Sequence, residues 1–214
     1  GGMQRRLSIA LALVGDPNDA SEIGLVHVYT RPSDGAPWSA QPSAGLVASS
    51  WAGVNANFGY SVAIDGELAI VGAPNLGPAN FGWGQLFQRT GDTWSSVAIM
   101  TGPSPGGDTG TSVDIESGTG ESFIAIGAPD GGTNANGVVY LWRWDAATQA
   151  ATLEATFGPN IITTPSEFGQ SVDLDIDAAG DVVVAVGNAR ASESESRTFT
   201  RPRANAEASS GTSI

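Results

Sequence analysis

The chain has 214 residues, 41% of them hydrophobic, and a formal net charge of −13. Its length and apolar content suffice for a sizeable core, but its negative charge would repel a nucleic-acid backbone or an anionic membrane surface, so we expect no nucleic-acid partner. The chain has no cysteine, which excludes disulfides and cysteine-ligated zinc. No apolar run approaches the ~20 residues that a membrane helix needs, so we also expect no membrane insertion.

The first element in chain order is expected at residues 7–14. Arg5 and Arg6 precede this apolar run, a pattern that signal peptides share. The run leads into Val14-Gly15-Asp16-Pro17, and this sequence recurs further along the chain. The recurrence favours a strand over a signal peptide.

An apolar strand that ends in a Gly-x-Pro turn recurs at intervals of 55 to 60 residues. Glycine allows a close backbone approach and proline ends a strand ladder, so each copy is expected to close a buried strand with a tight turn. The fourth copy has lost the proline. The four copies read Leu13-Val14-Gly15-Asp16-Pro17, Ile70-Val71-Gly72-Ala73-Pro74, Ala125-Ile126-Gly127-Ala128-Pro129 and Ala185-Val186-Gly187-Asn188-Ala189.

The later copies have similar neighbours. A short strand opened by Phe-Gly-x-Ser-Val precedes the second and fourth copies, a Thr-Gly-x-Ser-Val variant precedes the third, and Asp65-Gly66 supplies a hairpin signal in the second unit. A glycine-led alternating strand and a more irregular apolar stretch follow. Such a four-stranded unit cannot cover both of its faces alone, and propellers solve this by radial stacking. The opening segments are Phe58-Gly59-Tyr60-Ser61-Val62, Thr109-Gly110-Thr111-Ser112-Val113 and Phe168-Gly169-Gln170-Ser171-Val172.

The Phe-Gly and Gly-Ala-Pro signatures resemble the FG-GAP repeat of integrin α-type propellers. The resemblance implies an all-β fold, a β-propeller of four-stranded antiparallel blades with about 3.5 blades, incomplete or open. It also implies that the Phe of Phe-Gly packs between adjacent blades. The blades are placed at residues 7–57, 58–107, 108–167 and 168–187. Residues 188–214 show no strand periodicity and are predicted to be a flexible tail or an aberrant gene end.

The two ends of the repeat array are incomplete. Unit one lacks its Phe-Gly strand, and unit four stops after its second strand. An unpaired strand edge exposes backbone groups and invites pairing with another chain. We therefore expect an open half-ring whose ends meet another copy or missing sequence, and one expected assembly is a homo-oligomer formed through open blade edges.

One acidic motif suggests a metal site, because its aspartates occupy positions 1, 3, 5 and 9 and oxygen ligands suit calcium. FG-GAP repeats carry a similar calcium loop between the same two strands, so the resemblance implies calcium as the cofactor. The competing interpretation is a half-exposed strand, since apolar residues alternate with the first aspartates and Ala178 replaces the turn glycine. The predicted ligands are Asp173, Asp175, Asp177 and Asp181.

The sequence predicts no catalytic residues. His27 is the single histidine and alternates with Val26 and Val28 as a strand residue does, and no Gly-x-Ser-x-Gly elbow accompanies it. Trp38 and Trp94 follow turns at comparable places in their units, which favours packing over ligand stacking.

Three functions remain open. The first is a non-enzymatic adhesion or interaction module for a protein or glycan ligand, extracellular or at the cell surface, with or without calcium support. The second is a structural protein that self-assembles by completing its blades between chains. The third is a glycan-acting enzyme on a propeller, which only scattered carboxylates support. The repeat and the acidity favour the first, although a propeller is a scaffold compatible with many functions.

Overall fold

A computed structural model describes residues 10–19, 23–32, 35–49, 56–75, 81–103, 107–159, 166–188 and 197–201 of the chain. These residues form four antiparallel sheets and one 3-10 turn, η1 (Thr133–Ala135). The predicted all-β fold class is therefore confirmed. Within the same residues there is no helix with the length and apolar character to cross a membrane.

The sheets follow one another along the chain, and their strands pair in chain order. Sheet 1 contains β1 (Ala10–Asp16), β2 (Leu25–Arg31) and β3 (Ala44–Val47). Sheet 2 contains β4 (Ser61–Asp65), β5 (Leu68–Ala73), β6 (Trp83–Thr90) and β7 (Thr93–Met100). Sheet 3 contains β8 (Ser112–Ser117), β9 (Glu121–Ala128), β10 (Val138–Asp145) and β11 (Ala150–Phe157). Sheet 4 contains β12 (Phe168–Ile176), β13 (Val182–Asn188) and β14 (Arg197–Arg201).

The repeated sequence motifs recur at the same places in the sheets. Each Phe-Gly-x-Ser-Val segment leads into or begins an inner strand, β4, β8 or β12, and each Gly-x-Pro copy closes the next strand. The predicted hairpin is present, since Asp65 pairs with Leu68 across a two-residue connection. At the start of the chain β1 is a strand, as the recurrence of its sequence predicts.

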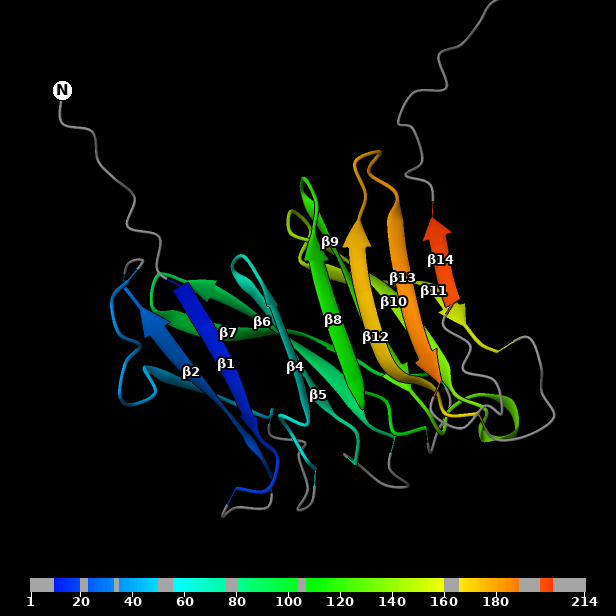
Figure 1. The fold of residues 1–214 in the computed structure, drawn as a ribbon, viewed down its shortest axis with the longest axis horizontal. Coiled ribbons are helices and arrows are strands. Elements are labelled where there is room, and N and C mark those ends of the chain that lie inside the picture. Colours follow the sequence, from blue (N-terminus) through cyan, green and yellow to red (C-terminus); the bar gives the residue numbers. More distant parts are fainter. Residues whose placement is uncertain are drawn as a thin grey trace, which may run out of the picture.

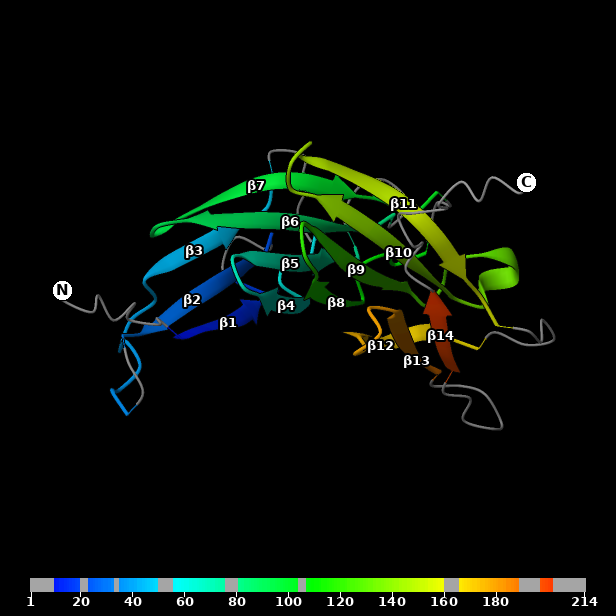
Figure 2. The same ribbon diagram turned by 90° about the horizontal axis from the view of Figure 1, so that it is seen from above.

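The four sheets lie side by side along an open arc, with β4, β8 and β12 on its inner side and β7 and β11 on its outer side (Figures 1 and 2). This is the arrangement of blades in an incomplete β-propeller. The arc leaves a face of sheet 1 and a face of sheet 4 without a neighbouring sheet among the described residues.

The hydrophobic core is divided into layers between neighbouring sheets, because each sheet has apolar side chains on both faces. Phe58 lies in the layer between sheets 1 and 2, and Phe168 lies in the layer between sheets 3 and 4. Both side chains are fully buried. The prediction that the Phe of Phe-Gly packs between blades is therefore confirmed at these two positions.

The prediction of a tail without strands from residue 188 onward is wrong in part. Strand β13 continues through Asn188, and β14 pairs with it antiparallel, Val184 opposite Phe199. The sequence of β14, Arg-Thr-Phe-Thr-Arg, alternates β-branched and aromatic residues, but it is too short to stand out from its polar surroundings. Among the described residues unit four therefore has three strands, and the remainder of the predicted tail, residues 189–196 and 202–214, lies outside them. The predicted blade boundaries stay predictions.

Candidate functional site

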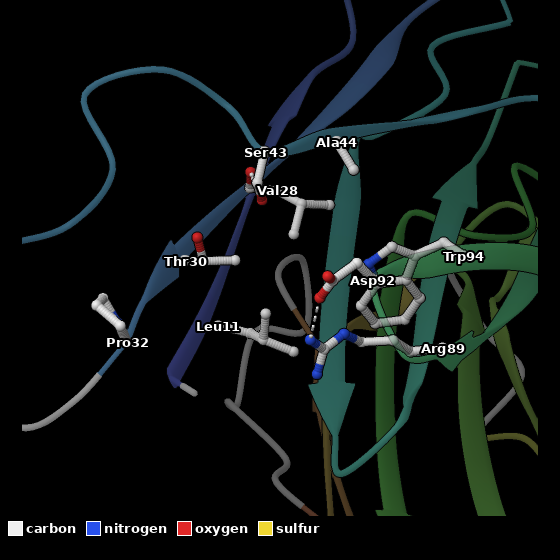
Figure 3. A pocket seen from close by; sticks show the side chains of 9 residues that line it. All are labelled: Leu11, Val28, Thr30, Pro32, Ser43, Ala44, Arg89, Asp92 and Trp94. Atoms are coloured by element: carbon white, nitrogen blue, oxygen red, sulfur yellow. Dashed lines mark hydrogen bonds and ion pairs between the residues drawn. The ribbon is translucent and has the colours of Figure 1, made fainter. Parts of the chain in front are cut away.

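A cavity of about 300 Å³ opens between sheets 1 and 2. Apolar side chains from β1, β2 and β3 line one side of it, and residues around the β6–β7 turn line the other (Figure 3). Pockets of this size, with an apolar lining and a few polar groups, are typical of ligand sites. The lining residues are Leu11, Val28, Thr30, Pro32, Ser43, Ala44, Arg89, Asp92 and Trp94.

We call this cavity between sheets 1 and 2 the outer cavity. Its polar side is organised around Arg89. Its guanidinium lies 3.4 Å from a carboxylate oxygen of Asp92 and 3.6 Å from one of Glu67. Only 10% of the Arg89 side chain is exposed, whereas 97% of the Asp92 side chain is. The guanidinium is therefore held in place beside the ring of Trp94, and the Asp92 carboxylate remains open to a ligand (Figure 3).

A second, more polar cavity of about 210 Å³ lies at the Phe-Gly ends of sheets 2 to 4. Asp108 and Asp130 both line it. Burial raises the pKa of Asp108, and the nearby charge of Asp130 raises it further. In sheet 2 the corresponding pair is uncharged, since Asn75 donates a 2.7 Å side-chain hydrogen bond to Asn57. The cavity is lined by Tyr60, Asp108, Thr111, Pro129, Asp130, Glu167 and Gln170.

Neighbouring sheets are joined by a repeated glycine contact, which we call the glycine joint. The glycine of each Gly-x-Pro copy lies against the carbonyl oxygen of the Phe-Gly glycine in the next sheet, so closely that an added Cβ would overlap that oxygen. Only glycine allows this approach. The three joints are formed by Gly15 with Gly59, Gly72 with Gly110, and Gly127 with Gly169.

Serine hydroxyls reinforce two of the three glycine joints. Ser61 Oγ donates a 2.8 Å hydrogen bond to the Gly110 carbonyl oxygen, and Ser112 Oγ donates an equal one to that of Gly169. The Ser in Phe-Gly-x-Ser-Val therefore connects its own sheet to the next. Sequence reasoning missed this role, although the recurrence of serine at this position is the signal that reveals it.

The FG-GAP repeat family model matches residues 43–84. This range holds both Phe58-Gly59 and Gly72-Ala73-Pro74, whose glycines take part in successive joints. The chain contains an FG-GAP repeat. No curated protein sequence matches the chain.

Carboxylates on the inner strands form further bonds between sheets. Asp65 Oδ2 accepts a 2.7 Å hydrogen bond from the Ser117 N–H in sheet 3. Asp114 Oδ2 accepts a 2.6 Å bond from the Leu174 N–H in sheet 4. The pKa of Asp114 is nevertheless raised, because burial outweighs the two backbone hydrogen bonds that lower it. These two aspartates therefore connect neighbouring sheets by hydrogen bonds.

The four predicted calcium ligands do not converge in the structure. Asp173 and Asp175 are exposed on β12, at the places that Asp114 and Glu116 occupy on β8. Asp177 Oδ1 is already bound to the N–H groups of Ala179 and Asp181, so it caps the turn before β13. This is the local role that aspartate commonly has in turns.

These residues do not fit a calcium site as they stand. Calcium takes 6–8 oxygen ligands, yet nowhere in the described part of the chain do three or more His, Asp or Glu side chains gather in a way that could hold a metal ion. The turn between β12 and β13 is held by backbone hydrogen bonds instead, including Asp177 N–H to the Asp181 carbonyl at 3.0 Å. Calcium binding here stays a prediction of the resemblance.

The single histidine and the tryptophans lie in different surroundings. His27 Nε2 lies 4.0 Å from Asp16 Oδ2 on the open face of sheet 1. Trp144 is fully buried, Trp94 packs against the layer between sheets 1 and 2, and Trp38 is 43% exposed with Arg31 placed 5.3 Å above its ring. Trp51 lies outside the described residues. The predicted packing role therefore holds for Trp94, while Trp38 is a surface residue.

Replacing Asp108 by asparagine is expected to stabilise the protein at neutral pH. The substitution reproduces the amide pair of sheet 2, and asparagine tolerates the positive φ of 51° at this position. Because the pKa of Asp108 is raised on folding, the wild type loses stability as the pH rises above the ordinary aspartate range. For such a solvent-screened pair the gain is up to about 1 kcal/mol. Melting temperatures measured from pH 3 to 7 should converge at acid pH and separate at neutral pH; parallel curves would contradict the assignment.

Proposed function

We propose that this chain is a non-catalytic adhesion or interaction module that binds a glycan outside the cell or at its surface. The observation that carries the proposal is the outer cavity, which offers an indole ring, an ordered guanidinium and an exposed carboxylate around an apolar floor. Sugar rings present an apolar face that stacks on aromatic side chains and hydroxyl groups that hydrogen-bond to charged ones.

The propeller-type scaffold supports this proposal because it holds the two walls of the cavity at a fixed distance. The wall from sheet 1 and the wall from sheet 2 are joined by the buried layer around Phe58 and by the contact of Gly15 with Gly59. Binding residues placed on rigid strands lose little conformational freedom when a ligand arrives. The acidic surface keeps such a module soluble in the extracellular medium.

The proposal is tested by applying the labelled full-length chain to a glycan array. Trp94→Ala removes the ring that lines the cavity and is expected to weaken binding at least about tenfold, the loss of about 1.4 kcal/mol. Asp92→Asn, at a fully exposed carboxylate, tests the same cavity with little effect on folding. Trp38→Ala is the matched control, because Trp38 also follows a turn but does not line the cavity. Absence of glycan binding by the wild type, or unchanged binding by both cavity variants, would contradict the proposal.

A further inference from the structure

The inner edge of β1 differs from the corresponding edge in the other sheets. In sheets 2, 3 and 4 the strand that ends in Gly-x-Pro is covered by an inner strand, β4, β8 or β12. In sheet 1 the order begins with β1, and no strand among the described residues pairs with its inner edge. An uncovered edge presents backbone N–H and C=O groups to any extended segment.

Side-chain burial marks the open face of sheet 1 beside this edge, because the counterparts of Val14 pack toward the preceding sheet and sheet 1 has none among the described residues. Val14, Val71, Ile126 and Val186 each precede the repeated glycine and so occupy one position of the repeat. Val14 is 50% exposed, whereas the other three are at most 1% exposed. An apolar side chain that is buried in three units is therefore left in solvent in the first.

The glycine joint next to β1 is half built. Gly15 lies against the Gly59 carbonyl oxygen as the other joints require. At the other two joints a serine on the inner strand donates to the corresponding oxygen, from Ser61 to Gly110 and from Ser112 to Gly169. Sheet 1 has no such strand in its described residues, so the acceptor is in place and the hydroxyl donor is missing.

The complete units share the serine opposite the repeated glycine, whereas the carboxylate two residues later is present in sheet 3 and replaced by Ala63 in sheet 2. Ser61 pairs with Gly72 and Ser112 pairs with Gly127, so the serine of the occupant belongs opposite Gly15. Two residues after Ser112, Asp114 accepts the N–H of Leu174 in the next sheet. By the same register, a carboxylate two residues after the occupant's serine would face the N–H of Ile64 in β4.

We propose that the inner edge of β1 binds an extended segment of a partner polypeptide with the pattern Ser-apolar-Asp, added antiparallel as the missing inner strand. This is β-strand addition, in which main-chain bonds supply affinity and side-chain positions supply specificity. The edge is separate from the outer cavity, so the proposal goes beyond the glycan-binding function. A hairpin with the connection and register of sheet 2 would bring Gln4 opposite Gly15, and Gln4 carries no hydroxyl and Arg6 no carboxylate, which favours a partner segment.

The test uses a labelled synthetic peptide with the sequence of residues 166–177, which contains Phe168, Ser171 and Asp173 in the required pattern. Saturable binding to the full-length chain is expected by fluorescence anisotropy, with hydrogen-exchange protection appearing in residues 10–16. A Ser171→Ala peptide should bind about fivefold more weakly, through loss of one hydrogen bond. A Val172→Pro peptide should not bind, because proline disrupts strand pairing.

Two protein variants locate the site. Val14→Asp should weaken peptide binding about tenfold, because it places a charge beside the apolar residue of the peptide. Val47→Asp is the matched control, since Val47 is 61% exposed on β3, two strands from the edge, and should bind as the wild type does. Glycan binding should be unchanged by Val14→Asp, so failure of one proposal is distinguishable from failure of the other.

Several results would overturn the proposal. One is absence of saturable binding up to the solubility limit of the peptide, and another is equal binding of the Val172→Pro peptide. A dimer that Val14→Asp dissociates, with no peptide binding, would assign the edge to a second copy. Protection of residues 10–16 that disappears when residues 1–9 are deleted would assign the edge to the chain itself.

Discussion

Replacing Gly72 by alanine is expected to destabilise the protein by about 3 kcal/mol or more, one of the two largest losses for a single substitution in this chain. The added Cβ would overlap the Gly110 carbonyl oxygen and Ser61 Oγ at the same time. One of these atoms belongs to the backbone of the next sheet, so relief requires the two sheets to separate. Overpacking typically costs about 1–3 kcal/mol, and the cost is higher where the neighbours cannot move.

Gly158→Ala is the control for this substitution, because the nearest atom to the added Cβ is Val138 Cγ1 at 4.0 Å. Thermal unfolding should show a fall of about 6 °C or more for Gly72→Ala, from about 2–4 °C per kcal/mol in a chain of this size. The control should melt near the wild-type temperature. Equal melting temperatures for the two variants would show that the glycine joint is not a constraint.

Phe58→Ala is expected to cost about 3–5 kcal/mol, the usual range for deletion of a buried aromatic ring. Phe58 is fully buried between sheets 1 and 2 and meets Phe87 edge-on, with ring centroids 6.1 Å apart and an interplanar angle of 68°. Its loss leaves a cavity lined by two rigid sheets, which cannot collapse onto it.

The consequence of Phe58→Ala should be measured by urea unfolding, with Phe81→Ala as the control. Phe81 is 37% exposed, and its truncation is expected to cost less than about 1 kcal/mol. If the two truncations shift the unfolding midpoint equally, Phe58 does not hold sheets 1 and 2 together. Loss of glycan binding in Phe58→Ala without a loss of stability would instead give the ring a direct role at the outer cavity.

The sequence alone predicts most of the architecture, because the same motif recurs at the same place in each unit. Four glycines at regular intervals, each after an apolar run, locate β1, β5, β9 and β13, and Phe58 and Phe168 mark the inter-sheet layers. Even the irregular copy behaves as the others do, since Gly110 follows Thr109 rather than phenylalanine and still forms a joint with Gly72. Periodicity and turn chemistry are local signals, and this fold is built from local units.

The site residues were less predictable because their partners lie on the neighbouring sheet. The aspartates of β12 match the spacing of calcium ligands along the sequence. Their counterpart Asp114, however, accepts hydrogen bonds from two backbone N–H groups, one of them 60 residues away in the chain. Likewise, Arg89 and Leu11 line one cavity although no sequence pattern links them. Strand β14 was missed for another reason, because its five residues carry too little apolar periodicity to be recognised.

The glycine joints also bear on how such a chain can change its length during evolution. Each joint uses one glycine from the preceding sheet and one from the start of the following unit, and at two of the three joints the serine comes from the preceding sheet. A duplication or deletion with both breakpoints at the same place in two units therefore restores the same contact at the new junction. Whole units can be gained or lost without redesigning their neighbours, whereas an insertion inside a unit would break a joint on each side.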